Sequence, residues 1–343
     1  MSQIIEQTAP KNERLFVTRA AHATIDFVFI VLMLLLLLLS IYIKMDSDSV
    51  YTAADPKQWI GYKPTADDTL SFEELQKLNS DVIGWLTIYG TNIDYPLVHS
   101  DSDNNYYLSH NPEKKPESSG SLYLDFRNKP DFYDFNINIH GHHMEKHKMF
   151  GDLDQFAEEK FFQSHEFGNI FYNGQNHGLQ IIAVILADGY DGKLYQPGLT
   201  NDEAKLTFIN HIYEEAKYIR GVDMSKRKEL VAGVTSPLTP NDKILVFSTC
   251  NLTKTNGRYV VIAKVLDHTV DNPYKGTEIK KTERIDTFTL FNQYGSLPLW
   301  IWIAIVILLT ILVYVLYRLS RRRDRRIANR NAETSEGEDA YDQ

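Results

Sequence analysis

Three side chains in this sequence have the types and the neighbours that acyl transfer requires. Cys250 ends the apolar run KILVFSTC, His142 follows the run FNINIHG, and Arg258 opens the run RYVVIAKVL. A cysteine thiol ordinarily has a pKa of about 8.5, so a nucleophilic cysteine needs a nearby His or Arg that favours the thiolate. A histidine can protonate a departing amine near neutral pH. A permanently charged arginine can stabilise the oxyanion of a tetrahedral intermediate.

Each of these residues also has an ordinary structural interpretation, and the residues alone leave both open. A lone cysteine is most often a small buried hydrophobe, and Arg258 could be a plain strand-edge cation. His140, His142, His143 and His147 lie close together in the sequence and suggest a metal site. However, strand alternation puts His143 on the face opposite His140 and His142, and no obvious carboxylate stands at ligand spacing. We therefore expect no metal and no cofactor.

Two uncharged apolar segments flank the part of the chain that carries these residues. The first, FVFIVLMLLLLLLSIYI, covers residues 27–43, and the second, LPLWIWIAIVILLTILVYVLY, covers residues 297–317. The second has the length of a membrane span, and the first is at the short limit. No cleavage site of the signal-peptide type follows the first segment. We therefore predict an uncleaved anchor there and a second transmembrane helix near the C-terminus.

The distribution of Lys and Arg gives the predicted orientation. Seven arginines from Arg318 to Arg330 follow the second apolar segment, and Lys11, Arg14 and Arg19 precede the first. Positively charged flanks stay in the cytoplasm, so both termini are expected inside the cell membrane and the part between the spans outside. Arginines that abut a span are typical of a membrane flank rather than of a nucleic-acid site. An odd cysteine in an exported domain is either an intermolecular link or a reactive thiol.

Short strand patterns dominate the exported part. Runs rich in β-branched and aromatic residues predict strands at 81–100 (broken by a turn at 89–92), 120–126, 135–141, 169–173, 179–190, 243–250 and 258–266. Helices are expected at 71–79, with Ser71 as N-cap, and at 149–156, 159–166 and 202–220. Several short strands without regular alternation with helices favour a mainly β fold, a barrel or a sandwich with peripheral helices.

The predicted organisation has seven parts. Residues 1–24 form a cytoplasmic segment, 25–44 a transmembrane helix, 45–70 an extracellular linker, 71–270 the catalytic domain, 271–296 a second linker, 297–317 a transmembrane helix, and 318–343 a basic and then acidic cytoplasmic tail. A domain of about 200 residues can bury one sizeable core.

Taken in order, the motifs resemble those of the sortases of Gram-positive bacteria. The family signature T-L-x-T-C corresponds to VFSTC at 246–250, and the pairs G-H and G-R-Y-V-V occur in the family's order. The resemblance covers roughly residues 71–270 and is closest to class B. The stretches that carry it are DVIGWLTIYGTNIDYPLVHSDSDNNYYLSHN, SGSLYLDFRN and HGHHMEKHKMFGDL, together with the wide, helix-containing gap between His142 and Cys250.

This resemblance implies a closed eight-stranded β-barrel and a ping-pong transpeptidation. Cys250 would attack the Thr carbonyl of a pentapeptide sorting signal near the C-terminus of a surface protein, and an amine would resolve the thioacyl enzyme. His142 would be the general acid and base, and Arg258 would orient the peptide and stabilise the oxyanion. The residues that would line the substrate groove are Ser248, Thr249, Asn104 and Leu108.

Two features depart from the class B pattern. His140 stands where class B often has Tyr, which could alter the groove. The span at 297–317 is more typical of pilus-assembling class C enzymes, whose lid the residues Asp55, Pro56 and Trp59 resemble. The amine acceptor is therefore open: a cross-bridge of a cell-wall precursor or a lysine of a pilin. A catalytically silent, membrane-held binding protein on the same barrel is a further alternative. A papain-like hydrolase is disfavoured because its Cys precedes its His.

Overall fold

The chain forms two compact units. The computed structural model describes residues 11–65, 69–226, 237–251, 255–275, 304, 307–319 and 322–323. One unit comprises Met1–Ser49 and Ile285–Gln343, and the other comprises Val50–Arg284. Most of the predicted linker 271–296 and of the tail 318–343 lies outside the described residues.

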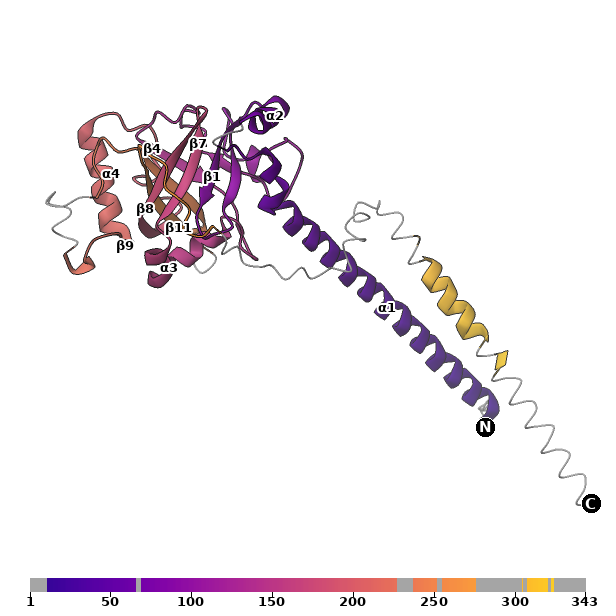
Figure 1. The fold of residues 1–343 in the computed structure, drawn as a ribbon. Helices are drawn as coiled ribbons and strands as arrows, with labels where there is room; N and C mark the ends of the chain where they lie inside the picture. Colours follow the sequence, from indigo (N-terminus) through magenta and orange to yellow (C-terminus); the bar gives the residue numbers. More distant parts are fainter. Residues whose placement is uncertain are drawn as a thin grey trace, which may run out of the picture. The chain divides into compact units, whose positions relative to one another are not determined.

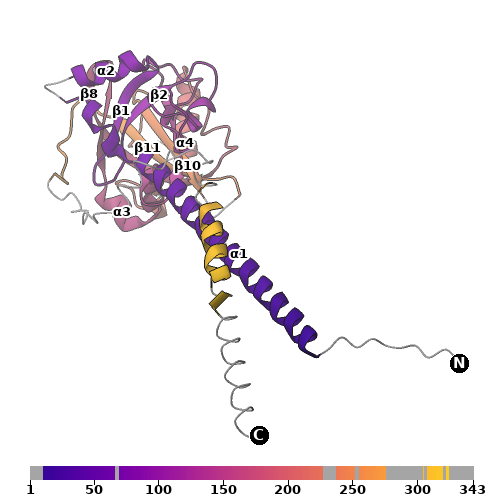
Figure 2. The same ribbon diagram turned by 90° about the vertical axis from the view of Figure 1, so that its right-hand side faces the viewer.

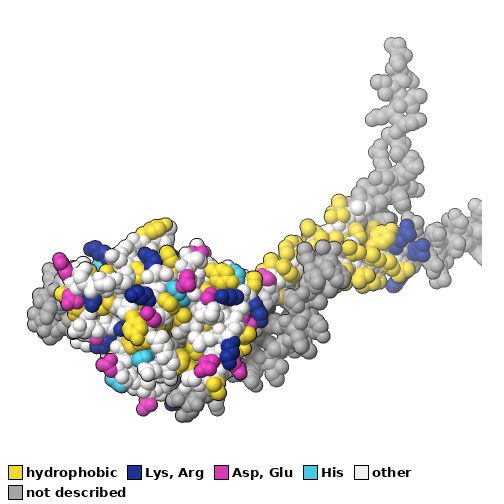
Figure 3. Space-filling model, turned by 90° about the horizontal axis from the view of Figure 1, so that it is seen from above, with side chains coloured by type: hydrophobic (Ala, Val, Ile, Leu, Met, Phe, Trp, Pro, Cys, Tyr) yellow, Lys and Arg dark blue, Asp and Glu magenta, His cyan; other side chains and the backbone are white. Residues whose placement is uncertain are grey.

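The first unit contains helix α1, Lys11–Ala53, which runs on into the second unit. Its part Thr24–Ala53 is long and apolar enough to cross a membrane, and hydrophobic side chains cover its surface (Figure 3). This supports the predicted N-terminal anchor. Of the predicted second span, the described part is the apolar helix Ile307–Leu319, which is shorter than a membrane crossing requires. The rest of 297–317 lies outside the described residues, apart from residue 304.

Eight strands of the second unit close into a barrel (Figure 1). Paired neighbours follow the order β11-β10-β4-β3-β2-β1-β7-β8, and β8 pairs with β11 to complete the circle. The pairs β2–β3 and β4–β10 are parallel. The predicted closed eight-stranded barrel is thereby confirmed. The strands are β1 Val82–Ile88, β2 Asp94–His99, β3 Leu122–Leu124, β4 Asn136–His140, β7 Phe167–Tyr172, β8 Gln175–Asp188, β10 Ile244–Asn251 and β11 Gly257–Val265.

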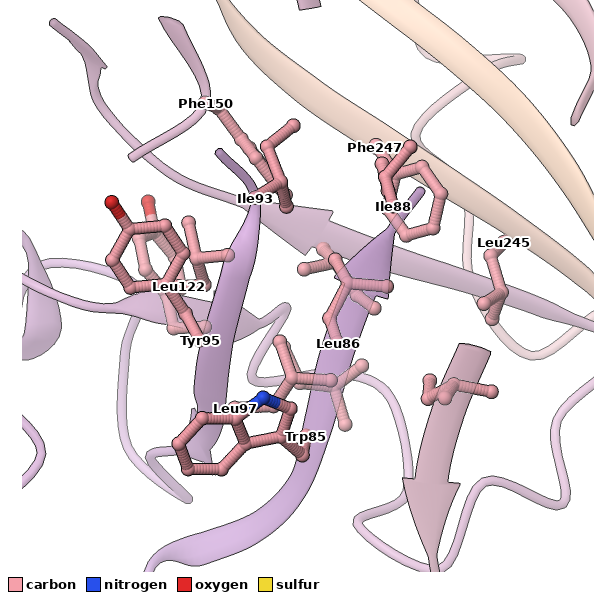
Figure 4. Packing of buried hydrophobic residues seen from close by; sticks show 14 of the residues in the cluster. Trp85, Leu86, Ile88, Ile93, Tyr95, Leu97, Leu122, Phe150, Leu245 and Phe247 are labelled. Atoms are coloured by element: carbon pink, nitrogen blue, oxygen red, sulfur yellow. The ribbon is translucent and has the colours of Figure 1, made fainter. Parts of the chain in front are cut away.

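Strand β10 is buried on both faces, which explains its unbroken apolar run. Leu245 and Phe247 belong to the cluster inside the barrel, and Figure 4 shows them with residues of β1, β2 and β3. Ile244 and Val246 point to the opposite face, because side chains alternate along a strand. There they join a second cluster that includes residues of helix α4, Asp202–Glu215. Helix α4 therefore covers the outside of the strand that carries Cys250.

The helix predicted at 202–220 is too long at its C-terminal end. Asn201 caps α4 by accepting a hydrogen bond from Ala204 N at 2.8 Å, but the chain leaves the helix after residue 215. It then forms strand β9, Ala216–Ile219, which pairs with Ala183–Ile185 of β8. Pairing with β7 stops at Gln180, so β9 takes the edge of β8 that β7 has left. This long-range pairing overrides the local helical pattern.

The remaining helices differ from the predictions at their ends. Helix α2, Leu70–Leu78, begins after Thr69, so Ser71 is not its N-cap. The segment predicted as a helix at 149–156 is the 3-10 helix η4, Gly151–Ala157, and helix α3 covers Glu159–Ser164. Three further short 3-10 helices are η1 Pro56–Gln58, η2 Ile60–Tyr62 and η3 Tyr106–Leu108, and η5 Met224–Lys226 follows β9.

Part of the segment predicted as a linker at 45–70 packs on the barrel. Helix α1 continues to Ala53, and Ala54 and Trp59 belong to the core cluster inside the barrel. A short hairpin that the sequence did not predict consists of β5, His143–Met144, and β6, Lys148–Met149. On the face of this unit in Figure 3, positive and negative side chains of the described residues are interspersed.

Candidate active site

Strands β10 and β11 lie side by side (Figure 2), and Cys250 and Arg258 are opposite each other near one end of this pair. They are direct partners in the antiparallel register, and Arg258 Nη1 donates a hydrogen bond to Cys250 Sγ at 3.6 Å. Cys250 is an exposed free thiol, whereas its neighbours Thr249 and Asn251 are buried. Strand alternation thus turns the cysteine outward beside a fixed positive charge. The sulfur is therefore both open to a substrate and next to a permanent cation.

His142 lies just beyond β4, at the same edge of the barrel. Strand β4 runs parallel to β10 with His140 opposite Ser248, so the two strands end together. His142 Nε2 lies 2.8 Å from the carbonyl oxygen of Leu108. A carbonyl only accepts, so Nε2 carries the hydrogen, and Nδ1 of the neutral ring is the nitrogen that can take up a proton. Within the described residues, no hydrogen bond joins His142 to Cys250.

Close packing explains the glycine before His142. A Cβ on Gly141 would lie 2.3 Å from Leu122 Cδ2 and 3.0 Å from Phe150 Cδ2. The Gly141 carbonyl accepts a hydrogen bond from Thr249 Oγ1 at 2.8 Å, and its N–H donates to Ser248 O at 3.3 Å. The motifs G-H and S-T-C are thus bonded to each other, which fixes the histidine loop against the cysteine strand.

Ser248 and Thr249 are buried, and each is bonded within the protein. The Ser248 hydroxyl lies 2.8 Å from the hydroxyl of Tyr195, which comes from the loop between β8 and α4. Burial raises the pKa of Tyr195 to about 12, although its bond with Ser248 and the charge of Arg258 act in the opposite direction. Tyr195 therefore stays protonated at neutral pH. The sequence analysis missed this residue because it lies in a loop outside any motif.

Asp125 is a buried carboxylate that the sequence analysis also missed. Arg127 donates to it from Nε at 2.9 Å and from Nη2 at 2.8 Å, and Asn104 Nδ2 donates at 3.2 Å. His140 Nε2 lies 3.5 Å from Asp125 Oδ2. Burial by itself would raise the pKa of Asp125, but the bonds from Arg127, with a smaller effect of His140, hold it well below its usual range.

The hydrogen bonds around Asp125 link segments that are far apart in the sequence. Arg127 Nη2 also donates to the carbonyl of Tyr195 at 2.9 Å. Asn104 Oδ1 accepts from Phe126 N at 2.8 Å. Asn104 therefore holds the Asp125 loop, and Leu108 holds the His142 ring through its carbonyl.

The four clustered histidines have different partners. His143 Nε2 lies 3.0 Å from Asp154 Oδ2, and His147 Nδ1 lies 2.6 Å from Asp152 Oδ1. His140 adjoins Asp125, and His142 binds a carbonyl. In the part of the chain that the structure describes, no three His, Cys, Asp or Glu side chains are grouped to hold a metal ion.

No family model matches the chain. Among curated proteins, sortase B of Listeria monocytogenes is 32% identical over 197 residues, which are 56% of this chain and 73% of the relative. The chain belongs to the sortase B family. Sortase B of Staphylococcus aureus is 28% identical over 200 residues, 57% of this chain and 74% of the relative. The solved sortase B of Clostridium perfringens is 28% identical with a TM-score of 0.51, covering 57% of this chain and 100% of that one.

Membership of this family confirms two predictions from the sequence. The protein is a cysteine transpeptidase, and its class is B. In the segment that resembles a class C lid, Pro56 and Trp59 are buried. Asp55 of the same segment forms an ion pair with Lys148.

The Asp125 carboxylate makes the stability of this sortase depend on pH. Its pKa is about 3.9 in an unfolded chain and lower in the folded protein. As the pH falls through this interval, the unfolded chain binds a proton first, so the stabilisation present above about pH 4 is progressively lost. Asp125→Asn should lower the free energy of unfolding at pH 7 by about 1.5–3 kcal/mol and flatten its fall at acid pH. Urea unfolding between about pH 2 and pH 7 measures both. Equal stability and equal slopes would contradict the assignment.

Proposed function

We propose that this sortase cleaves a C-terminal sorting signal of surface proteins and transfers the acyl group to an amine, which anchors those proteins to the cell wall. The observation that supports this most is the exposed Cys250 thiol with the Arg258 guanidinium 3.6 Å from its sulfur. A thiol of this kind differs from the inert buried cysteine of the structural interpretation, since it is open to a substrate and adjoins a permanent cation.

Cys250 is the proposed nucleophile. Its thiolate attacks the carbonyl carbon of a threonine in the signal, and a tetrahedral oxyanion forms. When the oxyanion collapses, the C–N bond breaks, His142 gives its proton to the departing amine, and a thioester remains on Cys250. An acceptor amine then attacks the thioester, His142 takes a proton from it, and the C–S bond breaks. His142 is thus first an acid and then a base.

Arg258 is the proposed oxyanion donor. In the described part of the chain, both hydrogen bonds of its side chain come from Nη1, to Cys250 Sγ at 3.6 Å and to Gly257 O at 3.1 Å. A guanidinium has five N–H donors in one plane, so Nε and Nη2 can hold a peptide carbonyl while the charge stays beside the sulfur. The charge meets the oxyanion without any proton transfer.

Four residues form the wall of the proposed groove, and hydrogen bonds within the protein hold each of them in place. Ser248 binds Tyr195, Thr249 binds Gly141, and Leu108 binds His142. Asn104 holds the Asp125 loop. These bonds, three from side chains and one from the Leu108 carbonyl, hold the wall of the proposed groove in place. Preorganised groups cost less to arrange when a peptide binds.

The proposed partners follow from this chemistry. The acyl donor is a surface protein with a C-terminal sorting signal, and no nucleic acid takes part. The proposed acceptor is an amine of a cell-wall precursor. A pilin lysine is the alternative that the acceptor experiment below can reveal. The catalytic domain faces the outside of a two-span membrane protein, because Lys and Arg flank both apolar segments on the side of the termini.

The acyl-transfer step can be tested with internally quenched pentapeptides that contain threonine, supplied with either a free peptide α-amine or a lysine side chain. We expect cleavage and a transfer product with a peptide α-amine. Cys250→Ala should abolish product, and Cys250→Ser should be nearly inactive because an alcohol ionises far less readily than a thiol. Transfer to lysine alone would favour pilin assembly. Substantial turnover by Cys250→Ala would exclude covalent catalysis at this residue.

The role of Arg258 depends on its planar fork of donors. Lysine keeps the charge but offers a single ammonium point, so Arg258→Lys should not restore function. Losing an oxyanion donor costs about 10²–10³ in kcat, or roughly 2.7–4 kcal/mol, and we expect at least this loss with little change in Tm. Lys264→Ala on the same strand is the matched control and should keep its turnover. Near wild-type turnover of Arg258→Lys would show the assigned role to be wrong.

The two-span topology predicts which parts of the chain a protease can reach. In intact protoplasts, added protease should digest residues 45–296 and spare tags at both termini. Permeabilised protoplasts serve as the control, in which both tags should be lost. Loss of the C-terminal tag from intact protoplasts would contradict the second span at 297–317.

A further inference from the structure

The hairpin β5–β6 follows His142 directly and closes back onto it. His143 and Met144 of β5 pair with Met149 and Lys148 of β6. Immediately after β6, Phe150 N donates a hydrogen bond to the carbonyl of His142 at 3.0 Å. The backbone of His142 is therefore held by the residue that follows the hairpin, so a displacement of β6 moves the histidine.

The backbone conformation of the hairpin is not one that its residues prefer on their own. Lys146, His147 and Met149 have φ values of 57°, 59° and 51°. This left-handed region is costly for residues other than glycine. Such conformations persist only where the surrounding structure holds them. The contacts that hold β6 thus contribute to the position of His142, together with the bonds of Gly141 and Leu108.

Three consecutive residues at the end of the hairpin make three such contacts. Lys148 Nζ forms an ion pair with the carboxylate of Asp55, which lies two residues after the end of α1. Met149 N donates to the hydroxyl of Tyr95 at 3.0 Å, and that hydroxyl donates to Ala54 O at 2.8 Å. Phe150 N then holds His142. Lys148, Met149 and Phe150 thus connect residues 54–55 to His142.

The ion pair is better protected from solvent than the contacts that Tyr51 of α1 makes with the hairpin. The side chain of Lys148 is 9% exposed and that of Asp55 is 25% exposed. Tyr51 also contacts the hairpin, through Glu145 Oε2 at 3.4 Å and Lys146 Nζ at 4.2 Å from its ring centre. Those groups are exposed, and surface contacts of this kind contribute little. A buried ion pair adds little net stability, yet losing one partner leaves an uncompensated charge.

We propose that Asp55 and Lys148 are positioning residues for His142, and that the end of the anchor helix is in this way a structural part of the active site. This inference rests on the proposed role of His142 as general acid and base. It adds that catalysis also requires a contact outside the groove, the ion pair between the hairpin and the residues that follow α1. Because the pair does not line the groove, its loss should affect proton transfer more than peptide binding.

The test uses the full chain in detergent micelles and the quenched pentapeptide that the wild-type protein cleaves. Asp55→Asn removes the charge but keeps an oxygen that can accept the hydrogen bond from Lys57 N, 3.0 Å in the structure. Lys148→Met keeps most of the aliphatic stem, and Lys148→Gln replaces it if Lys148→Met does not fold. Lys63→Met is the matched control, because it breaks the half-buried ion pair of Lys63 with Asp94, at 2.8 Å, which does not touch the hairpin.

We expect Asp55→Asn and Lys148→Met to lower kcat about 10-fold to 100-fold with KM almost unchanged, since small misplacements of catalytic groups have effects of this size. The double variant should be no slower than the slower single variant, because both changes break one contact. Lys63→Met should keep wild-type kcat even where its Tm falls as much. Wild-type kcat in Asp55→Asn, or additive losses in the double variant, would overturn the proposal.

His142→Ala is measured in the same series, so that failure of the positioning proposal can be distinguished from failure of the proposed role of His142. If His142→Ala is inactive while Asp55→Asn turns over normally, the positioning proposal alone is overturned. If His142→Ala turns over at the wild-type rate, the proposed role of His142 fails, and the positioning proposal fails with it.

Discussion

Strands β4 and β10 pair in parallel, with His140 opposite Ser248, and the arrangement of the site depends on this pairing. Parallel neighbours end at the same edge of a sheet, so the residues after β4 meet the residues that end β10. The antiparallel partner β11 begins at that edge and brings Arg258 opposite Cys250. Residues separated by more than a hundred positions in the sequence are thus brought to one rim of the barrel.

Burial on both faces makes this rim rigid. The two clusters that enclose β10 leave Cys250 as the exposed residue of its strand. Bonds between Thr249 and Gly141, and between Leu108 and His142, then fix the loops around it. A transpeptidase benefits from such rigidity, because groups already in place need no reorganisation when charge develops on the substrate.

The sequence predicted those features that depend on local patterns. Alternation and apolar runs indicated the strands of the barrel, and the motifs around Cys250 and His142 indicated the family. Contacts between distant segments were not predictable in this way. Tyr195 pairs with Ser248, and Asp125 contacts Asn104 and His140 besides its neighbour Arg127, so these contacts join distant parts of the chain. Strand β9 forms because β8 has a free edge. The β5–β6 hairpin likewise depends on Tyr95 and Asp55, which no local pattern connects to it.

The central claim is that the reaction passes through a thioester on Cys250. Intact-mass spectrometry of the full chain, quenched in acid during turnover of a cleaved pentapeptide without an amine acceptor, tests it directly. The account predicts a mass increase equal to the acyl half of the peptide, located on the tryptic peptide that contains Cys250, lost on adding an acceptor amine and absent in Cys250→Ala. Rapid cleavage with no acyl adduct under these conditions, or an adduct on another residue, would contradict it.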